Sequence, residues 1–101
     1  MTEKPKERPK AKAYKQFEND RVIVTQWRFA PGAETGWHCH GLDYIVVPEM
    51  DGTLLIESKQ GDNTAALEKA QSYAREAGVE HNVINANDYE FAFVEVELKP
   101  S

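Results

Sequence analysis

The sequence is short of cysteine and of long apolar runs, and each shortage excludes a class of protein. Cys39 is its one cysteine, so no disulfide can form within the chain, as expected in a reducing compartment. The longest uninterrupted apolar runs have only a few residues, far fewer than the roughly 20 that cross a bilayer. The first fifteen residues also lack the apolar stretch of a secretory signal. We therefore expect a cytoplasmic protein that does not associate with a membrane.

Charge is distributed unevenly along the chain, although its net value is only −5. Residues 1–15 contain six basic and two acidic side chains and carry +4, whereas residues 16–101 contain six basic and fifteen acidic ones and carry −9. The first segment has almost nothing to bury, so it predicts a flexible basic tail, either solubilising or, as the sharper alternative, a nucleic-acid-binding arm. Residues 16–101 form the predicted single domain, whose acidic surface would repel phosphates. We expect no nucleic-acid partner.

Short segments rich in β-branched and aromatic residues predict an all-β fold. They alternate with turn residues, such as the Asp51-Gly52 pair that is typical of a β-hairpin. Many short antiparallel strands in one small chain indicate a sandwich or a barrel. The main predicted strands cover residues 21–30, 35–40, 42–50, 53–59, 80–86 and 89–99, and the last of them alternates most strongly between apolar and polar positions.

Residues 65–77 allow two interpretations. The segment contains good helix formers, which favours a helix. Its spacing gives no clean apolar stripe, however, and strand patterns flank it on both sides. We therefore predict two short strands over most of the segment, at residues 65–70 and 71–77, with the helix as the alternative.

The three histidines give the strongest functional signal. His38 and His40 are separated by one residue, and side chains at i and i+2 of a strand point to the same side. If a later strand brings His81 to the same place, three imidazoles can hold a metal ion at about 2.0–2.1 Å. Imidazole suits several transition metals, so the pattern does not specify which one binds. Histidines that merely share one face of a barrel are the alternative.

Two motifs around these histidines resemble those of cupins. The matching residues are Gly32, His38 and His40 for the first motif and Gly78, His81 and Asn85 for the second. The segment from about residue 21 to residue 98 looks like one small cupin barrel, similar to beta-alanine degradation-type cupin proteins. The resemblance implies a double-stranded β-helix, or jelly-roll, of antiparallel strands over residues 16–101. It also implies a divalent transition metal (iron, zinc, nickel, copper or manganese) held by the three histidines.

The first cupin motif also contains a glutamate ligand, which this chain lacks. Its position falls at Tyr44 or Ile45, and the spacing to Gly52 favours Ile45. Asp43 is the nearest carboxylate, one or two residues early, and could replace the glutamate only if the strand starts differently. The resemblance therefore implies a three-histidine site with two or three coordination positions open. Without the carboxylate the site keeps more positive charge, which favours an anionic ligand.

Other polar residues are candidates for the chemistry around the metal. Tyr44 and Tyr73 carry hydroxyls that need partners when buried, and either is a candidate catalytic group that orients the substrate or handles a proton. Arg75 and Arg28 are candidate clamps for a substrate carboxylate. Cys39 is out of phase with the two histidines beside it, so we expect a buried, inert thiol that faces away from the site.

The residues and the resemblance together predict a metal-dependent enzyme that acts on a small polar or carboxylate metabolite, in amino-acid or β-alanine catabolism. Dioxygenase, isomerase and lyase are the reaction classes that this prediction includes. The alternative is a non-catalytic small-molecule-binding or scaffold cupin with a degenerate site, which the missing glutamate favours. Cupins of this size resemble one another in pairing through strands, so the resemblance implies a homodimer.

Overall fold

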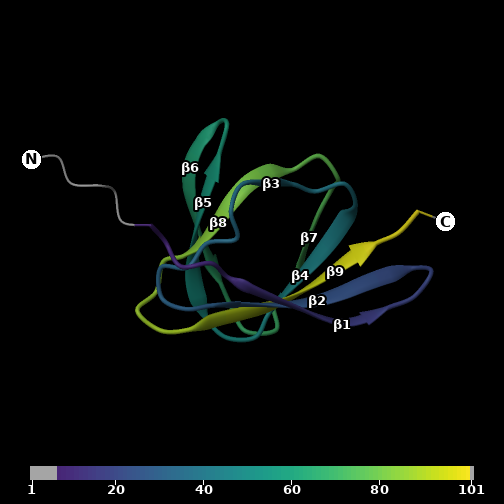
Figure 1. Ribbon diagram of the computed structural model, residues 1–101, viewed down its shortest axis with the longest axis horizontal. Helices are drawn as coiled ribbons and strands as arrows, with labels where there is room; N and C mark the ends of the chain where they lie inside the picture. The colour runs from purple at the N-terminus through teal and green to yellow at the C-terminus, as the bar shows by residue number, and fades with distance from the viewer. Residues whose placement is uncertain (1–6, 101) are drawn as a thin grey trace, which may run out of the picture.

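Two antiparallel β-sheets face one another across the centre of the molecule (Figure 1). The structure, a computed structural model, describes residues 7–100. No helix occurs in this range, and hence none that is long and apolar enough to cross a membrane. The strands are β1 (Lys12–Glu18), β2 (Val22–Phe29), β3 (His38–Cys39), β4 (Asp43–Pro48), β5 (Gly52–Ser58), β6 (Gly61–Leu67), β7 (Tyr73–Arg75), β8 (Glu80–Asn85) and β9 (Phe91–Leu98).

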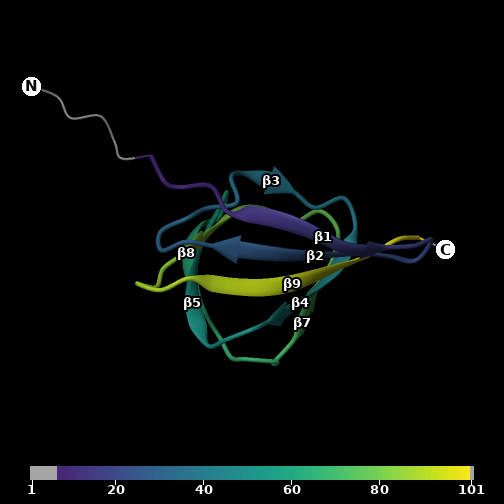
Figure 2. The ribbon, with the colours of Figure 1, turned by 60° about the horizontal axis from the view of Figure 1, so that its bottom comes forward.

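The chain crosses repeatedly between the two sheets. One sheet has five strands in the order β1-β2-β9-β4-β7, and the other has four in the order β3-β8-β5-β6. β2 and β9, from opposite ends of the domain, pair along their whole length, and Figure 2 shows them side by side with β1 at the edge. All pairings between these strands are antiparallel. The space between the sheets therefore receives side chains from both halves of the sequence.

Aromatic side chains fill one end of the space between the sheets. Phe29 and Phe93 lie with ring centroids 5.4 Å apart, and Phe29 and Phe91 are fully buried. Burial of a side chain of this size stabilises the fold by roughly 1.5–3 kcal/mol. At Gly52 a Cβ atom would lie 2.6 Å from the Phe91 ring, so the predicted Asp-Gly turn also gives the ring room. The other end of the space is left open for the site described below.

The sequence does not predict β1. Residues 12–15, expected to end the flexible tail, lie in this strand, which pairs with β2 from Lys12 opposite Arg28 to Glu18 opposite Ile23. All seven of its side chains are exposed, so it shows no alternation between buried and exposed residues that would mark a strand. Strand β1 therefore begins within the predicted tail, and the domain boundary after residue 15 stays a prediction. Residues 1–6 of the predicted tail lie outside the described residues.

Residues 65–77 contain the end of β6, a turn and β7. The helix alternative is wrong, and strand is confirmed for residues 65–67 and 73–75. Ala70 lies in the turn with a φ of 65°, and its N–H donates to the carbonyl of Pro48 at 2.9 Å. A left-handed residue of this kind interrupts a helix as well as a strand, which explains why the segment divides there.

Candidate metal centre

His38 and His81 lie opposite one another on neighbouring strands of the four-stranded sheet. His38 begins β3, His81 is the second residue of β8, and the two residues pair directly in the antiparallel register. Side chains directly opposite in an antiparallel pair lie on the same face of the sheet. Strand pairing therefore brings together two histidines that are far apart in the sequence.

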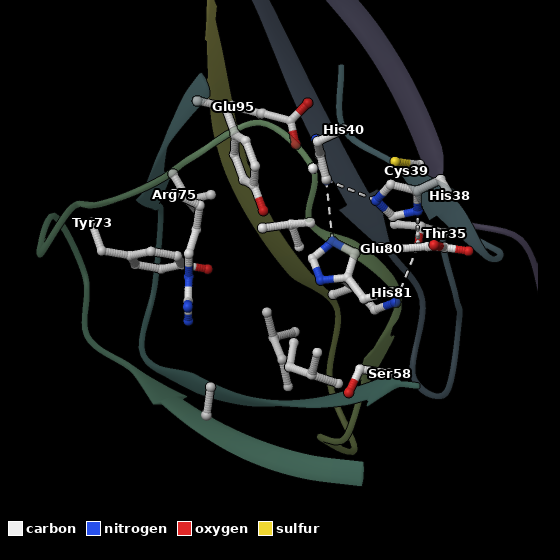
Figure 3. A pocket seen from close by; sticks show the side chains of 18 of the residues that line it. Thr35, His38, Cys39, His40, Ser58, Tyr73, Arg75, Glu80, His81 and Glu95 are labelled. Carbon is white, nitrogen blue, oxygen red and sulfur yellow. Dashed lines mark hydrogen bonds between the residues drawn. The ribbon is translucent and has the colours of Figure 1, made fainter. Parts of the chain in front are cut away.

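His40 lies just after β3 and is held by the loop that precedes β8. Its N–H donates to the carbonyl of Val79 at 2.8 Å, and its own carbonyl accepts the N–H of Gly78 at 2.8 Å. Gly78 has a φ of +101°, a conformation that favours glycine. These backbone bonds place the third imidazole beside the other two (Figure 3).

The three imidazoles converge through their Nε2 atoms. Nε2 of His40 lies 2.9 Å from Nε2 of His38 and 3.1 Å from Nε2 of His81. One ring nitrogen from each histidine lies within 4.8 Å of the others. Nitrogen ligands at 2.0–2.1 Å from a metal and at right angles to one another are about 3 Å apart, which matches the two distances from His40. The donor set therefore fits a divalent transition metal.

Burial keeps two of the imidazoles neutral near pH 7. It is the main cause that lowers the pKa of His40 and of His81, each to about 4, and the charge of neighbouring His38 adds to the effect. Neutral imidazole is the form that binds a metal. Nδ1 of His38 lies 2.8 Å from the carbonyl oxygen of Gly36 and 3.3 Å from Oγ1 of Thr35. A proton on this Nδ1, donated to the carbonyl, leaves Nε2 free as a metal ligand.

Tyr44 faces the site near the place of the missing glutamate. Its ring stacks on the imidazole of His40, with a centroid distance of 3.9 Å and an interplanar angle of 18°. Ile45, the position that the motif spacing favours, points to the opposite face of β4, so that register is wrong. Asp43 accepts the N–H of Ala77 at 2.8 Å through Oδ1 and lies outside the group of candidate ligands. Asp43 therefore does not replace the glutamate.

A cavity of about 740 Å³ adjoins the histidines and is lined by both sheets (Figure 3). Tyr73 and Arg75 of β7 both line it, with the guanidinium carbon 5.6 Å from the centroid of the tyrosine ring. Among residues 7–100 no carboxylate forms an ion pair with Arg75, which leaves it available to a ligand. Arg28 lies away from the cavity and pairs with Glu90 at 2.6 Å. Of the two arginines, only Arg75 is brought to the site.

Two further residues of the motif segments, Cys39 and Asn85, lie outside the group of candidate ligands. Cys39 is exposed, so the expectation of a buried thiol is wrong. Asn85 is almost fully buried, and its Nδ2 donates to the carbonyls of Phe29, Ala30 and Tyr89 at 2.8–3.2 Å. These bonds satisfy carbonyls at the end of β2 and in the loop before β9, so the role of Asn85 is structural.

Glu95 lines the cavity and is absent from the prediction. It lies on β9, on the face that also carries Phe91 and Phe93, and is 8% exposed. Burial raises the pKa of its carboxyl to about 7, and the charge of Glu97 adds to the rise. The sequence gives only a partial signal, because Glu95 shares its phase with Phe91 and Phe93 but also alternates with Val94 and Val96.

Known proteins share this architecture. The beta-alanine degradation protein BauB of Pseudomonas aeruginosa is 61% identical over 92 residues, which cover 91% of this chain and 97% of the relative. A crystal structure of a cupin domain from Bordetella pertussis has a TM-score of 0.93 at 53% identity and covers 95% of this chain and 100% of its own. A cupin superfamily protein from Desulfitobacterium hafniense has a TM-score of 0.70 at 16% identity over 95% of this chain and 84% of its own, which supports the fold alone. No family model matches the chain.

Proposed function

The chain belongs to the cupin family, with the predicted all-β fold of a single antiparallel jelly-roll, and from this premise we propose that it is a metal-dependent enzyme acting on a small polar or carboxylate metabolite. One observation carries the proposal, namely the convergence of the Nε2 atoms of His38, His40 and His81 beside a cavity. The lowered pKa values of His40 and His81 support it, because the ligands need no deprotonation near pH 7.

In this proposal each polar group near the cavity has a distinct task. The three histidines hold a divalent transition metal (iron, zinc, nickel, copper or manganese), which as a bound ion supplies a Lewis acid with open coordination positions. Arg75 binds the carboxylate of the substrate, since no protein carboxylate pairs with it among residues 7–100. Tyr44 and Tyr73 orient the substrate and donate or accept protons through their hydroxyls, which face the same cavity.

The name of the BauB relative supports a place in β-alanine catabolism. A short amino carboxylate of this kind is small enough for a cavity of about 740 Å³ and matches the positive charge of the metal and Arg75. Reactions of the dioxygenase, isomerase and lyase classes all fit a three-histidine site with open positions. The proposal includes a cytoplasmic location, which the unpaired thiol of Cys39 supports.

A second candidate is a binding protein without turnover. The observation that favours it is Tyr44, whose ring stacks on His40 near the place where the cupin motif has a glutamate ligand. In this case the metal and Arg75 still bind the carboxylate ligand, but no reaction follows. The two candidates share the metal site and differ only in chemistry.

One experiment separates these candidates. Untagged protein is loaded in turn with each of the five metals and incubated with a panel of short carboxylates and amino carboxylates, including β-alanine, while NMR follows each compound. The enzyme proposal predicts metal-dependent consumption of one panel member, lost in His81→Ala. Saturation transfer to a compound that is not consumed supports the binding protein. Neither consumption nor metal-dependent binding of any compound would contradict both.

We also propose a homodimer that forms through the outer face of the five-stranded sheet. The alternation of β2, β4 and β9 places apolar side chains on this face, opposite those that line the cavity. The chain alone leaves these side chains partly exposed, and a second copy related by a two-fold axis would cover them. The residues of this outer apolar face are Phe17, Val24, Ile45, Val47, Val94 and Val96.

A further inference from the structure

Glu95 is a buried carboxyl that the described part of the protein leaves without a partner. Its side chain is 8% exposed and lines the cavity, and Figure 3 shows the carboxyl directed into it. Within residues 7–100, no ion pair reaches its oxygens and they accept no hydrogen bond. A carboxyl that opens to a cavity and has no partner among the described residues is available to a ligand.

Other polar groups surround Glu95 on the same sheet. Tyr73 and Glu95 flank Val46 of β4 in the strand register, so all three form one row across the inner face. The indole N–H of Trp27 is buried and makes no hydrogen bond with any described residue. Tyr44 precedes Val46 by two residues, so its ring belongs to the next row of the same face. We call Trp27, Tyr44, Tyr73 and Glu95 the polar wall of the cavity.

Among residues 7–100 no cation forms an ion pair with Glu95 of the polar wall. Arg75, the cation of the adjoining row, lies over the ring of Tyr73 and forms no ion pair with Glu95. Glu97, two residues further along β9, adds negative charge to the same face and helps to raise the pKa of Glu95 to about 7. The indole N–H of Trp27 lies close enough to lower the pKa of Glu95 somewhat, but it makes no hydrogen bond. A cation brought by the ligand would compensate the charge of Glu95.

We propose that the polar wall is a subsite for the protonated amine of an amino carboxylate, with Glu95 as its counter-charge. An ammonium group gains the charges of Glu95 and Glu97, whereas a hydroxyl gains only a hydrogen bond. The inference rests on the proposed function, because the carboxylate end of the same ligand lies at the metal and Arg75. The histidines of the four-stranded sheet and Arg75 of β7 then bind the carboxylate end, and Glu95 of β9 binds the ammonium end.

Matched ligands test this subsite directly. β-Alanine, 3-hydroxypropionate and butyrate have the same length and end in an ammonium, a hydroxyl and a methyl group, and 4-aminobutyrate and pentanoate form a second pair that is one carbon longer. Titration calorimetry measures the affinity of each for the metal-loaded, untagged protein. In at least one series we expect the ammonium compound to bind about tenfold more tightly than its methyl analogue. The ratio should fall to about twofold or less in Glu95→Gln.

The matched control is Glu90→Gln, which removes an exposed carboxylate paired with Arg28 outside the cavity and should leave the ratio unchanged. Metal content, measured on every variant, separates the two proposals. Failure to take up metal would contradict the proposed function. Normal metal content without an ammonium preference in either series, or an unchanged preference in Glu95→Gln, would overturn the amine subsite. If the β-alanine series shows the preference, equal binding of 3-hydroxypropionate and β-alanine would overturn it as well.

Discussion

The two sheets contribute different chemistry to one cavity. The four-stranded sheet and its adjoining loop supply three imidazoles, in which Nε2 of His40 lies 2.9 Å from that of His38 and 3.1 Å from that of His81. Strand pairing and backbone hydrogen bonds hold them there. The five-stranded sheet supplies Tyr44, Tyr73 and Glu95, whose polar atoms are spread over three strands. A metal needs ligands at fixed short distances, whereas a small organic ligand can adapt to wider spacing. In our proposal the four-stranded sheet therefore binds the metal, and the five-stranded sheet selects the ligand.

The outer faces of the two sheets differ as well. Over the four-stranded sheet the N-terminal segment is held by charges, since Arg8 pairs with Glu34 and Glu57, and Asn82 donates to both carboxylates. Over the five-stranded sheet lies the outer apolar face. The charged groups on the four-stranded sheet therefore have partners within the chain. The outer apolar face has no such cover, and association with another copy would bury it.

Loss of an imidazole should have the largest effect of any change to the cavity. His81→Ala removes one of three ligands, so we expect the affinity for the metal to fall by about 100-fold or more, beyond the 10–100-fold that outer-shell partners contribute. Competition with a chelating dye measures it. Ser58→Ala, opposite His81 in the register of β5 and β8, is the matched control and should change the affinity by about twofold at most. Equal metal affinity in both variants would show that His81 is not a ligand and would contradict metal binding by the four-stranded sheet.

A charge on the outer apolar face should break the dimer. In Val96→Lys an ammonium replaces a central side chain of this face, and we expect the dissociation constant of the dimer to rise by about 100-fold. Thr64→Lys places the same charge on the outer face of the four-stranded sheet and should leave the dimer intact. Sedimentation velocity over a range of concentrations measures both. A monomeric wild-type chain, or a dimer unaffected by Val96→Lys, would contradict the proposed interface.

The carboxyl of Glu95 should destabilise the metal-free protein at high pH. Its pKa is about 7 in the folded chain against 4.5 for the free group, so the folded state holds its proton more tightly and loses stability as pH rises from 4.5 to 7. Glu95→Gln should therefore be more stable than the wild type by about 1–2 kcal/mol at pH 8, after allowance for solvent in the cavity. This gain should shrink toward pH 5. Urea denaturation of both proteins measures the difference in stability. A gain that does not depend on pH would contradict the raised pKa of Glu95.

His40 and His81 should destabilise the metal-free protein at low pH, whereas Glu95 does so at high pH, and the expected change in stability is smaller. His40 and His81 have pKa values of about 4 when folded and 6.5 when free, so the unfolded chain takes up protons first as pH falls through 6.5. In the Glu95→Gln background, metal-free protein should lose about 1 kcal/mol between pH 7 and pH 5.5. Urea denaturation at the two pH values measures the loss. Constant stability there would show that the imidazoles are not held neutral.

The site residues that lie in short sequence motifs are predictable from the sequence. Those that strand register brings together from distant segments are not. His38, His40 and His81 stand in short motifs, and an i, i+2 pair on a strand already implies a common direction. The order of strands places Glu95 beside Val46 and Tyr73, and that register cannot be derived from the composition of β9 alone. The missing glutamate shows the same limit, because one residue of register decides whether Tyr44 or Ile45 faces the cavity.

The fold follows the same rule. The antiparallel strands and the absence of a helix over residues 65–77 follow from apolar alternation and turn residues. β1 is different, because its seven exposed side chains gain nothing from burial and its place depends on backbone pairing with β2. The prediction that Arg28 binds a substrate carboxylate failed for a similar reason. The sequence around Arg28 does not show that Glu90 lies beside it on the outer face and pairs with it.

X-ray absorption at the edge of the bound metal tests the central claim most directly. The untagged protein is reconstituted with each candidate metal and dialysed, and its metal content and absorption spectrum are measured. The account predicts about one ion per chain with about three imidazole nitrogens at roughly 2.0–2.1 Å. A chain that retains none of the five metals, or an ion with fewer than two imidazole ligands, would contradict it.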